Sequence, residues 1–501
     1  MDGGTSPLLF RHRRCRFALV TALTLVVPLL AASTLPDIAS GYTPRGPIYI
    51  DGNGDFAPGN GVTGGNGTWD DPYLIQGWEV GVVSSWAAIE IRNTDAHFVI
   101  DAVHVFNPSG RIDAVGLRFA NVTNGVVSTS LVEDLLYAVQ FPQFSPWSSN
   151  ITLARSEFRD NGWMLGCNPT LCVGADRLTV ANNTIDRSHV ELRGSTNVSI
   201  LGNTFVDSGI ARSGSSSRGI VIAFNTMTNG SIWAQDTVFI GSPLDMAILG
   251  NAISNGNIFL SQADNVIIQD NSLSNAGATG LFFDAGLYLD LTSNVQVSGN
   301  TISGPLWGVV VNGILFPGQP ISITGNVVAN TSYGISGGAS AWTPVHHNCL
   351  LSNAVHGQGP GFWDNGYPSG GNYWDDYGGV DLFSGPLQDQ PGGDGIGDTP
   401  HLLMSGGVDR YPLMTSGGGS CVGDFVPPTN PLLLSAELAG GALGDLLLTW
   451  RAAWDEFLPG GPWRTRSPEA TRSRAPSRQS PRCRRPAPPR TPTCASGAVT
   501  T

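Results

Sequence analysis

A phrase of six residues recurs along the middle of the chain with an asparagine at its fourth position. It reads ILGNTF at residues 200–205, IAFNTM at 222–227 and IQDNSL at 268–273. Apolar residues alternate around the asparagine, which is typical of strands rather than helices. The asparagine recurs every 20 to 29 residues, at Asn183, Asn203, Asn225, Asn251, Asn271, Asn300, Asn326 and Asn348. A phrase with such a period indicates one structural unit stacked many times.

The same frame continues upstream with other residues at the asparagine position, namely Val103, Ser130 and Ser156. With them the frame predicts an all-β solenoid of about eleven coils, ending near Asn348. An asparagine that points inward at a bend can hydrogen-bond to backbone groups and to the asparagine of the next coil. We therefore expect the eight asparagines to form a structural ladder inside the stack.

A second series of polar residues follows four positions after the first. Its members are Asn107, Asp134, Asp160, Arg187, Asp207, Asn229, Asn255, Asn275, Gly304, Asn330 and Ser352. Nine of the eleven are Asn, Asp or Gly, which tolerate left-handed backbone. We interpret the three aspartates of this series as corner residues of the coils rather than as catalytic acids.

The composition narrows the class of partner. The 501 residues include 65 glycines but no lysine, and the formal net charge is −13. Nucleic acids and anionic membranes are bound through basic patches, so the charge argues against both as partners. A glycine-rich chain with few charges is typical of a turn-rich, exported β protein.

The N-terminus has the pattern of an export signal. Four arginines between Arg11 and Arg16 precede an apolar run from Phe17 to Ala32, and small residues follow. We expect residues 1–41 to be a cleaved signal peptide, which predicts a secreted or cell-surface protein. An uncleaved N-terminal anchor is the alternative, and no later segment is apolar and long enough to cross a membrane.

The remaining chain divides by composition. Residues 42–76 are rich in Gly, Asn and Asp and predict an N-terminal cap, which closes the exposed edge of a solenoid. We assign coils to 77–358, a C-terminal cap to 359–416, a linker to 417–430, a partial sandwich domain to 431–459 and a tail to 460–501.

Two long motifs resemble a known family. GFWDNGYPSGGNYWDDYGGVDLFSGPLQDQPGGDGIGDTP at residues 361–400, followed by VDRYPLM at 408–414, is similar to the C-terminal signature of NosD-like β-helix proteins. NGVTGGNGTWDDPYLIQGWEV at 60–80 is similar to the N-terminal segment of secreted archaeal and bacterial members. The resemblance covers about residues 45–416. It implies a right-handed parallel β-helix of the type named for carbohydrate-binding proteins and sugar hydrolases.

The end of the chain resembles a second, incomplete domain. Residues 431–459 are similar to the first two strands of a fibronectin type III-like sandwich, which needs roughly 100 residues and seven strands. From Gly460 onward the chain is rich in Arg, Pro, Ser, Ala and Thr. Either a reading-frame shift near residues 455–465 or a disordered basic tail accounts for this change.

Two clusters of oxygen ligands could hold Ca²⁺. Asp51, Asn53 and Asp55 alternate as at the start of a calcium loop, although its twelfth position is Val62 rather than Glu. Asp394 and Asp398 flank a glycine-bent segment in the C-terminal motif. A turn without metal is the competing interpretation for both clusters.

Copper, which the NosD resemblance implies through nitrous oxide reductase maturation, is not expected here. His346 and His347 form a single pair, and the six methionines form no cluster of soft ligands. Among the cysteines, Cys167 and Cys172 could form a small disulfide, and Cys349 with Cys421 is a second candidate pair.

An enzyme that cleaves glycosidic bonds needs two carboxylates beside the bond. Asp284, Asp290 and Glu191 are the candidate catalytic acids because they lie outside both series. Alignment of the coils puts Tyr288 level with Glu191, and Tyr288, Trp307 and Trp233 are the candidate residues for stacking on sugars. The motifs of β-helical polygalacturonases are absent from the sequence, and the scarcity of basic residues weakens a lyase mechanism.

These observations favour an exported, non-catalytic β-helix that binds polysaccharide or another surface component. A carbohydrate-active enzyme, as a glycoside hydrolase or polysaccharide lyase, is the second interpretation. A NosD-like accessory protein for copper maturation is the third. The sequence does not predict an oligomeric state.

Overall fold

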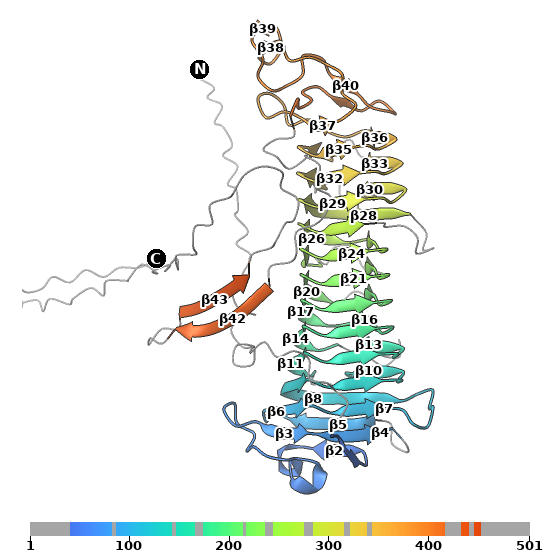
Figure 1. The fold of residues 1–501 in the computed structure, drawn as a ribbon, viewed down its shortest axis with the longest axis vertical. Helices are drawn as coiled ribbons and strands as arrows, with labels where there is room; N and C mark the ends of the chain where they lie inside the picture. The colour runs from blue at the N-terminus through green and yellow to red at the C-terminus, as the bar shows by residue number, and fades with distance from the viewer. Residues whose placement is uncertain are drawn as a thin grey trace, which may run out of the picture. The chain divides into compact units, whose positions relative to one another are not determined.

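The chain folds as an all-β parallel solenoid, which confirms the fold predicted from the repeat. The computed structural model describes residues 41–82, 87–142, 147–165, 174–213, 217–235, 244–274, 284–314, 321–337, 343–415, 432–439 and 445–451. Successive coils stack so that each strand pairs in parallel with the equivalent strand of the next coil (Figure 1). Two short 3₁₀ turns, Asn53–Asp55 and Pro58–Asn60, precede the third strand.

Three parallel sheets run along the stack. Sheet A contains β1 (Thr43–Arg45), β4 (Trp78–Gly81), β7 (His104–Phe106), β9 (Leu131–Glu133), β12 (Glu157–Arg159), β15 (Thr184–Asp186), β18 (Thr204–Val206), β21 (Thr226–Thr228), β24 (Ala252–Ser254), β27 (Ser272–Ser274), β29 (Thr301–Ser303), β32 (Val327–Ala329), β35 (Cys349–Leu351) and β37 (Tyr373–Trp374).

Sheet B contains β2 (Ile48–Asp51), β5 (Ala87–Thr94), β8 (Val115–Ser128), β10 (Tyr137–Gln140), β13 (Trp163–Leu165), β16 (His189–Leu192), β19 (Ile210–Ser213), β22 (Ile232–Gln235), β25 (Ile258–Ser261), β28 (Ala285–Ser298), β30 (Trp307–Ile314), β33 (Tyr333–Ser336) and β36 (Val355–Gln358).

Sheet C contains β3 (Tyr73–Gln76), β6 (Phe98–Asp101), β11 (Ser149–Ala154), β14 (Asp176–Ala181), β17 (Thr196–Leu201), β20 (Arg218–Ala223), β23 (Met246–Leu249), β26 (Asp264–Gln269), β31 (Ser322–Thr324) and β34 (Val345–His346). The long strands β8 and β28 belong to both sheet B and sheet C.

Left-handed corners bracket most strands of sheet A. The residue directly before each ladder position from Val103 to Asn348 has φ between 44° and 68°. The described residues of the second series from Asp134 to Ser352 have φ between 45° and 86°. Asp134, Asp160 and Asp207 are therefore corner residues, as the sequence predicted. Two left-handed residues five positions apart leave room for only the three-residue strands seen between them.

The ladder asparagines are buried and joined in an unbroken chain. From Asn203 onward, each Oδ1 accepts the side-chain amide of the preceding asparagine at 2.9–3.0 Å and also its backbone N–H. Each side-chain amide also donates to a backbone carbonyl, as Asn251 does to Ile222 at 2.9 Å. The ladder therefore satisfies polar groups that the bend would otherwise strand in the interior.

The stack extends further at both ends than the sequence boundaries predicted. Strands β1, β2 and β3 lie within 42–76, yet they pair in parallel with β4, β5 and β6. At the other end β37 pairs with β35, and Asn372 accepts from Asn348 as a further ladder residue. The glycine-rich composition of both segments masked coils that lack the six-residue phrase.

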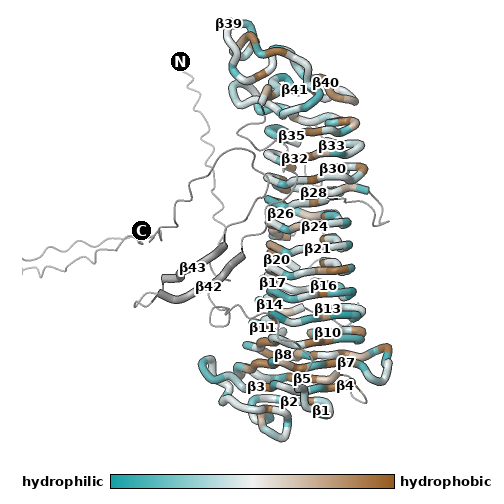
Figure 2. The backbone as a smooth tube through the Cα atoms, viewed as in Figure 1, coloured by the Kyte–Doolittle hydropathy of each residue, from teal (hydrophilic) through white to brown (hydrophobic). Residues whose placement is uncertain are grey.

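Hydrophobic and hydrophilic residues alternate along the coils (Figure 2). The buried apolar side chains form a continuous core. Beyond β37 the C-terminal cap is formed by two short antiparallel pairs, β38 (Phe383–Ser384) with β39 (Gln390–Pro391) and β40 (His401–Leu402) with β41 (Val408–Asp409). Trp363 and Trp374 are fully buried beneath the cap. The cap thus closes the apolar end of the stack.

The segment predicted as a partial sandwich contains one antiparallel pair, β42 (Leu432–Ala439) with β43 (Asp445–Arg451). The predicted signal peptide up to residue 40, the linker and the tail lie outside the described residues. Among the described residues, no helix is long and apolar enough to cross a membrane.

Candidate functional site

The outer face of sheet B carries the candidate residues from the middle coils. In β28 the side chains of Leu287 and Leu289 point into the core, so Tyr288 and Asp290 lie on the outer side. Strand register joins one outer column across successive coils: Glu191, Ala211, Trp233, Phe259, Tyr288 and Val310. Glu191 and Tyr288 therefore share a column, as the aligned coils indicated.

The three candidate acids are not brought together. Glu191 lies four strands from the strand that carries Asp290, a separation of about 19 Å at the usual strand spacing. Asp284 precedes Asp290 by six residues, or about 20 Å along an extended strand. Acid pairs in glycosidases are separated by about 5–9.5 Å. These acids therefore do not form such a pair.

Asp290 has structural partners in the adjacent coils. Its carboxylate accepts from the Ser261 hydroxyl at 2.9 Å and from the Asn312 side-chain amide at 3.0 Å. Burial, followed by the negative charge of Asp290, raises the pKa of Tyr288 above its ordinary value. Asp290 thus belongs to a hydrogen-bonded row on the outside of sheet B.

The candidate aromatic residues mostly stack on one another. Tyr288 lies parallel to Phe259 with ring centroids 5.4 Å apart, and its side chain is only 4% exposed. Trp307 lies parallel to Tyr333 at 4.0 Å. These ring faces cover each other and leave little surface for a sugar. The sequence analysis missed both partners, Phe259 and Tyr333.

Trp233 differs from the other candidates because 42% of its surface is exposed. Phe259 supports it edge-on from the next coil, with centroids 5.8 Å apart. On the preceding coil the column holds Ala211, which offers only a methyl group, and Glu191 follows one coil further. We call Glu191, Ala211 and Trp233 the Trp233 strip. It places an exposed aromatic ring and a carboxylate on either side of a small residue.

Polar groups surround the acidic end of the Trp233 strip. Glu191 forms an ion pair with Arg193 at 3.6 Å. His189 precedes Glu191 by two residues and accepts a hydrogen bond at Nδ1 from the Gly209 backbone N–H at 3.1 Å. Burial lowers the pKa of His189, which favours the neutral imidazole with its proton on Nε2. Donors and acceptors therefore lie two strands, or roughly 10 Å, from the exposed indole.

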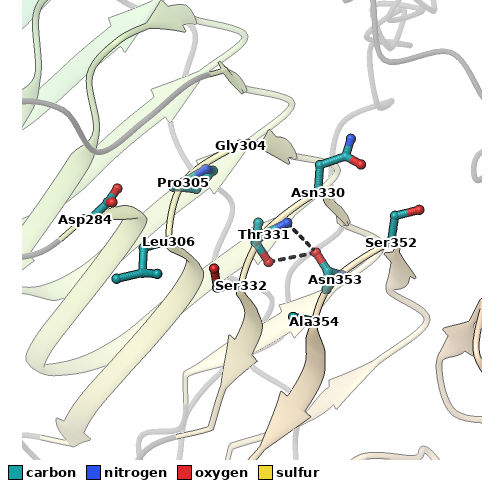
Figure 3. Close-up of a pocket in the computed structure, with 10 residues that line it drawn as sticks. All are labelled: Asp284, Gly304, Pro305, Leu306, Asn330, Thr331, Ser332, Ser352, Asn353 and Ala354. Atoms are coloured by element: carbon teal, nitrogen blue, oxygen red, sulfur yellow. Dashed lines mark hydrogen bonds between the residues drawn. The ribbon is translucent and has the colours of Figure 1, made fainter.

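Asp284 lies apart from the Trp233 strip, in a shallow depression of about 800 Å³ over the corners of three coils (Figure 3). The depression is lined by Asp284, Gly304, Pro305, Leu306, Asn330, Thr331, Ser332, Ser352, Asn353 and Ala354. Thr331 donates to Asn353 Oδ1 through its N–H at 3.0 Å and its hydroxyl at 2.7 Å. Among the described residues of this lining Asp284 is the one acid, so these residues do not supply an acid pair.

The first candidate calcium cluster is occupied by protein donors. Asp51 pairs with the Arg92 guanidinium at 2.7 Å and accepts the Asn93 side-chain amide at 2.7 Å. Hydrogen bonds from Arg92 and Asn93 hold the pKa of Asp51 below its ordinary value. Asn53 bonds to Thr94, and Asp55 accepts the backbone N–H of Asp51. A guanidinium at this position does not fit a bound cation.

The second candidate cluster fastens loops of the cap. Asp398 accepts the backbone N–H groups of Leu382 and Phe383 at 3.0 Å. Asp394 accepts the N–H of Ile396 at 3.1 Å, which is the geometry of an Asx turn. Its own N–H donates to Asp381 at 2.9 Å. Backbone amides thus occupy these carboxylates in the places that a cation would take.

The His346–His347 pair lies at a corner of a coil, where His347 has φ of 58°. The two rings approach through their Nδ1 atoms at 2.7 Å, and His347 Nε2 lies 2.8 Å from the Ser369 carbonyl oxygen. Cys349 is disulfide-bonded, and its partner lies outside the described residues. Cys167 and Cys172 also lie outside them.

The C-terminal cap contains polar groups that the sequence analysis did not single out. Asp409 is completely buried and accepts from the Asn372 N–H at 2.7 Å and the Trp374 Nε1–H at 2.8 Å. Asp364 is almost buried and accepts two hydrogen bonds from one edge of the Arg410 guanidinium, from Nη2 at 2.6 Å and from Nε at 2.9 Å. The charge pattern of the cap motif gave no indication of which acids are buried.

Comparisons with known proteins support the fold. Residues 188–350 match the family model described as the right handed beta helix region. No curated protein sequence matches the chain.

Solved β-helix structures are similar at low identity. The catalytic domain of Agl-KA is 14% identical with a TM-score of 0.37, over 64% of this chain and 62% of that one. PfbA, a surface adhesin of Streptococcus pneumoniae, is 12% identical with a TM-score of 0.30, over 55% and 77%. The A-module of a mannuronan C-5 epimerase of Azotobacter vinelandii is 13% identical with a TM-score of 0.32, over 64% and 88%.

The chain spans less than two thirds of the Agl-KA domain, and similarity at these scores carries no argument about activity. The family model and the parallel stacking together identify a right-handed β-helix region as the central part of this chain.

Proposed function

We propose that this chain is an exported β-helix protein that binds a neutral polysaccharide through the Trp233 strip and does not cleave it. The exposed Trp233 ring, supported by Phe259 and separated from Glu191 by a small residue, is the observation that carries the proposal. An aromatic face with nearby hydrogen-bonding groups is the usual recognition surface for an amphipathic ring.

Charge favours a neutral ligand. The sequence contains no lysine, and no arginine occurs between Arg218 and Arg410. Strongly anionic chains such as polyuronates are bound through arginine and lysine. The acidic coils from Trp233 onward would repel such a ligand. A neutral glycan has no such penalty and can hydrogen-bond to the Glu191 carboxylate and the His189 imidazole at one end of the strip.

Catalysis is disfavoured by the separations of the acids. A hydrolase of the usual two-carboxylate type would need a second acid within about 10 Å of Asp290 or Glu191 on the same face. The candidates lie about 19–20 Å apart instead. The NosD-like copper function likewise lacks support, because the His346–His347 pair is engaged with itself and with Ser369.

A glycan array combined with a reducing-sugar assay tests this proposal. We expect binding to neutral polysaccharide without release of reducing ends. Trp233→Ala should weaken binding by about tenfold or more, as expected for a central aromatic contact. Trp69→Ala is the matched control, because Trp69 is 63% exposed but lies outside the strip.

Equal affinity of the two tryptophan variants would refute the Trp233 strip as the binding surface. If the unaltered protein released reducing sugar and Asp290→Asn did not, the protein would be a catalyst rather than a binding protein. Export is part of the same proposal, and N-terminal sequencing of the protein recovered outside the cell should find a start near residue 42.

A further inference from the structure

A histidine occupies an unusual position in the last coil. The register of sheet B makes Gly286, Gly308, Gly334 and His356 equivalent in successive coils. A Cβ at Gly334 would meet the carbonyl oxygen of His356 at 2.3 Å, so a following coil leaves no space for a side chain there. Among the described residues, β36 is the last strand of sheet B, and the end of the stack has room for the imidazole.

Both nitrogens of His356 face carboxylates. Nε2 lies 2.5 Å from Asp375 Oδ1, whereas Nδ1 lies 3.5 Å from Asp376 Oδ2. The imidazole is buried, with 8% of its side chain exposed. The short contact assigns the single proton of a neutral ring to Nε2. The lone pair of Nδ1 then faces a negatively charged oxygen, which is repulsive unless a cation lies between them.

A second histidine is available on the other side of Asp376. His401 Nε2 lies 3.8 Å from Asp376 Oδ1. The His401 ring packs against Trp374 at 4.7 Å, and its side chain is 18% exposed. Two ligands that share a tetrahedral zinc ion at about 2.0–2.2 Å lie roughly 3.3 Å from each other. The separations on both sides of Asp376 exceed this value by only a few tenths of an ångström.

Asp375 has the contacts of an outer-shell residue. Its Oδ1 holds His356 Nε2, and its Oδ2 accepts the backbone N–H of Ser352 at 2.6 Å. A histidine that binds a metal through one nitrogen commonly donates its other N–H to a carboxylate that is itself anchored. Asp376, by contrast, is half exposed, and among the described residues its carboxylate contacts the two imidazoles.

We propose that His356 Nδ1 and Asp376 bind a divalent transition metal of the zinc class, with Asp375 positioning His356 and His401 beside the site. One potential ligand atom from each of His356, Asp375 and Asp376 lies within 4.8 Å of the other two. Imidazole nitrogens with a carboxylate favour zinc over calcium or magnesium, which prefer oxygen ligands. Water would complete the coordination, and the ion would join β36 to the segment that follows β37.

Calorimetric titration of the full chain after chelator treatment tests the site. We expect one Zn²⁺ per chain, a higher melting temperature with Zn²⁺, and no comparable effect of Ca²⁺ or Mg²⁺. Asp376→Asn should abolish or strongly weaken Zn²⁺ binding. Asp375→Asn should reduce affinity by about 10- to 100-fold, as removal of an outer-shell partner does. His97→Ala is the control, because it removes a histidine directly before β6, near the opposite end of the stack.

His356→Ala removes a buried side chain and can prevent folding. Asp376→Asn changes a side chain that is 52% exposed, so it tests the site even if His356→Ala does not fold. A doubly protonated His356 would satisfy both carboxylates without a metal. In that case the chain would not bind Zn²⁺, or Asp376→Asn would bind it as the unaltered chain does, and either result would overturn the proposal. Binding of Ca²⁺ alone with the same dependence on Asp376 would overturn the choice of metal.

Discussion

The coils and the C-terminal cap satisfy buried polar groups with different chemistry. Inside the coils, the ladder asparagines pass hydrogen bonds from one coil to the next through neutral amides. In the cap, a buried carboxylate accepts backbone N–H groups, as Asp409 does from Asn372 and Tyr411. An amide both donates and accepts, whereas an ionised carboxylate only accepts. An asparagine can therefore be repeated indefinitely, and an aspartate can end the series.

Asp409 lies where the two regions meet. The ladder runs to Asn372, whose backbone N–H donates to Asp409 Oδ2. Trp374 donates to the same oxygen, and the Tyr411 N–H donates to Oδ1. The ionised Asp409 carboxylate has no hydrogen to donate to a further coil, so the ladder ends at this residue. The solenoid therefore ends where the ladder changes from an amide to a carboxylate and where the cap covers the last coil.

The largest effect is expected from breaking the ladder at its centre. Asn251 Oδ1 accepts the N–H and the side-chain amide of Asn225, and its own amide donates to Ile222. Asn251→Ala leaves several of these groups unpaired in the core at about 1–3 kcal/mol each. We expect a loss of about 3–5 kcal/mol in the free energy of unfolding, measured by urea denaturation.

Serine provides an internal comparison for this variant. Ser130 Oγ already accepts the Val103 N–H at 3.2 Å and donates to the Ser128 carbonyl at 2.7 Å. Asn251→Ser should therefore retain part of the stability that Asn251→Ala loses. Equal losses in the two variants would show that the amide ladder contributes through volume rather than through hydrogen bonds.

The second prediction tests the carboxylate that ends the ladder. Burial raises the pKa of Asp409 to about 6, although three donors oppose that shift. Between pH 4 and 6 the folded protein keeps the proton that the unfolded chain, with a pKa of 3.8, has already released. Stability from this group is therefore present at pH 4 and lost as the pH rises through 6, by about 3 kcal/mol.

Asp409→Asn removes this titration. Between pH 4 and pH 7 we expect the unaltered chain to lose about 3 kcal/mol of unfolding free energy relative to Asp409→Asn. Groups whose pKa is lowered on folding have the opposite pH dependence, and their contribution cancels when the two proteins are compared. Asp364 is one of them: burial raises its pKa, but bonds from Arg410 outweigh burial and the net shift is downward. A difference that stays constant with pH would mean that Asp409 is ionised throughout.

The repeat could be predicted because each ladder asparagine lies in a phrase of alternating apolar residues. Asn372 was missed because GGNYW lacks the strand pattern on its N-terminal side. The outer column was also readable: Glu191, Ala211, Trp233 and Phe259 each follow a ladder asparagine by eight residues. Comparing the coils at that offset would have found Phe259. The exposure of Trp233 and the burial of Tyr288 depend on which neighbour covers each ring, which spacing alone does not contain.

The cap was less predictable than the coils for a physical reason. Its acids all lie in similar glycine-rich surroundings in the sequence, yet Asp398 binds backbone amides, Asp364 binds Arg410 and Asp376 faces two histidines. These roles depend on non-local contacts, such as the 46-residue separation of Asp364 and Arg410. No periodic pattern relates such residues, so the sequence identified the cap without assigning its acids.

A smaller effect is expected from the ion pair that fastens the cap. Arg410 holds the nearly buried Asp364 carboxylate, but its own side chain is 61% exposed. Breaking a buried pair costs about 3–5 kcal/mol, and solvent around the guanidinium reduces this. We expect Arg410→Ala to lower the unfolding free energy by about 2 kcal/mol. Asp364→Asn in the same background should restore part of it, because the unpaired charge is then removed.

The smallest effect is expected at the outer corners of the coils. Arg187 forms a two-pronged ion pair with Asp160 of the preceding coil, through Nε and through Nη2 at 2.9 Å, and both side chains are largely exposed. Hydrogen bonding to Asp160 raises the pKa of Arg187, but water and salt screen exposed pairs strongly. Arg187→Asn keeps a residue that tolerates the left-handed corner, so the urea midpoint should not change measurably. A clear drop in the urea midpoint of this variant, matched by a similar drop of the unaltered chain in high salt, would show that the outer polar residues also stabilise the stack. The distinction between interior amides and surface charges would then be weaker.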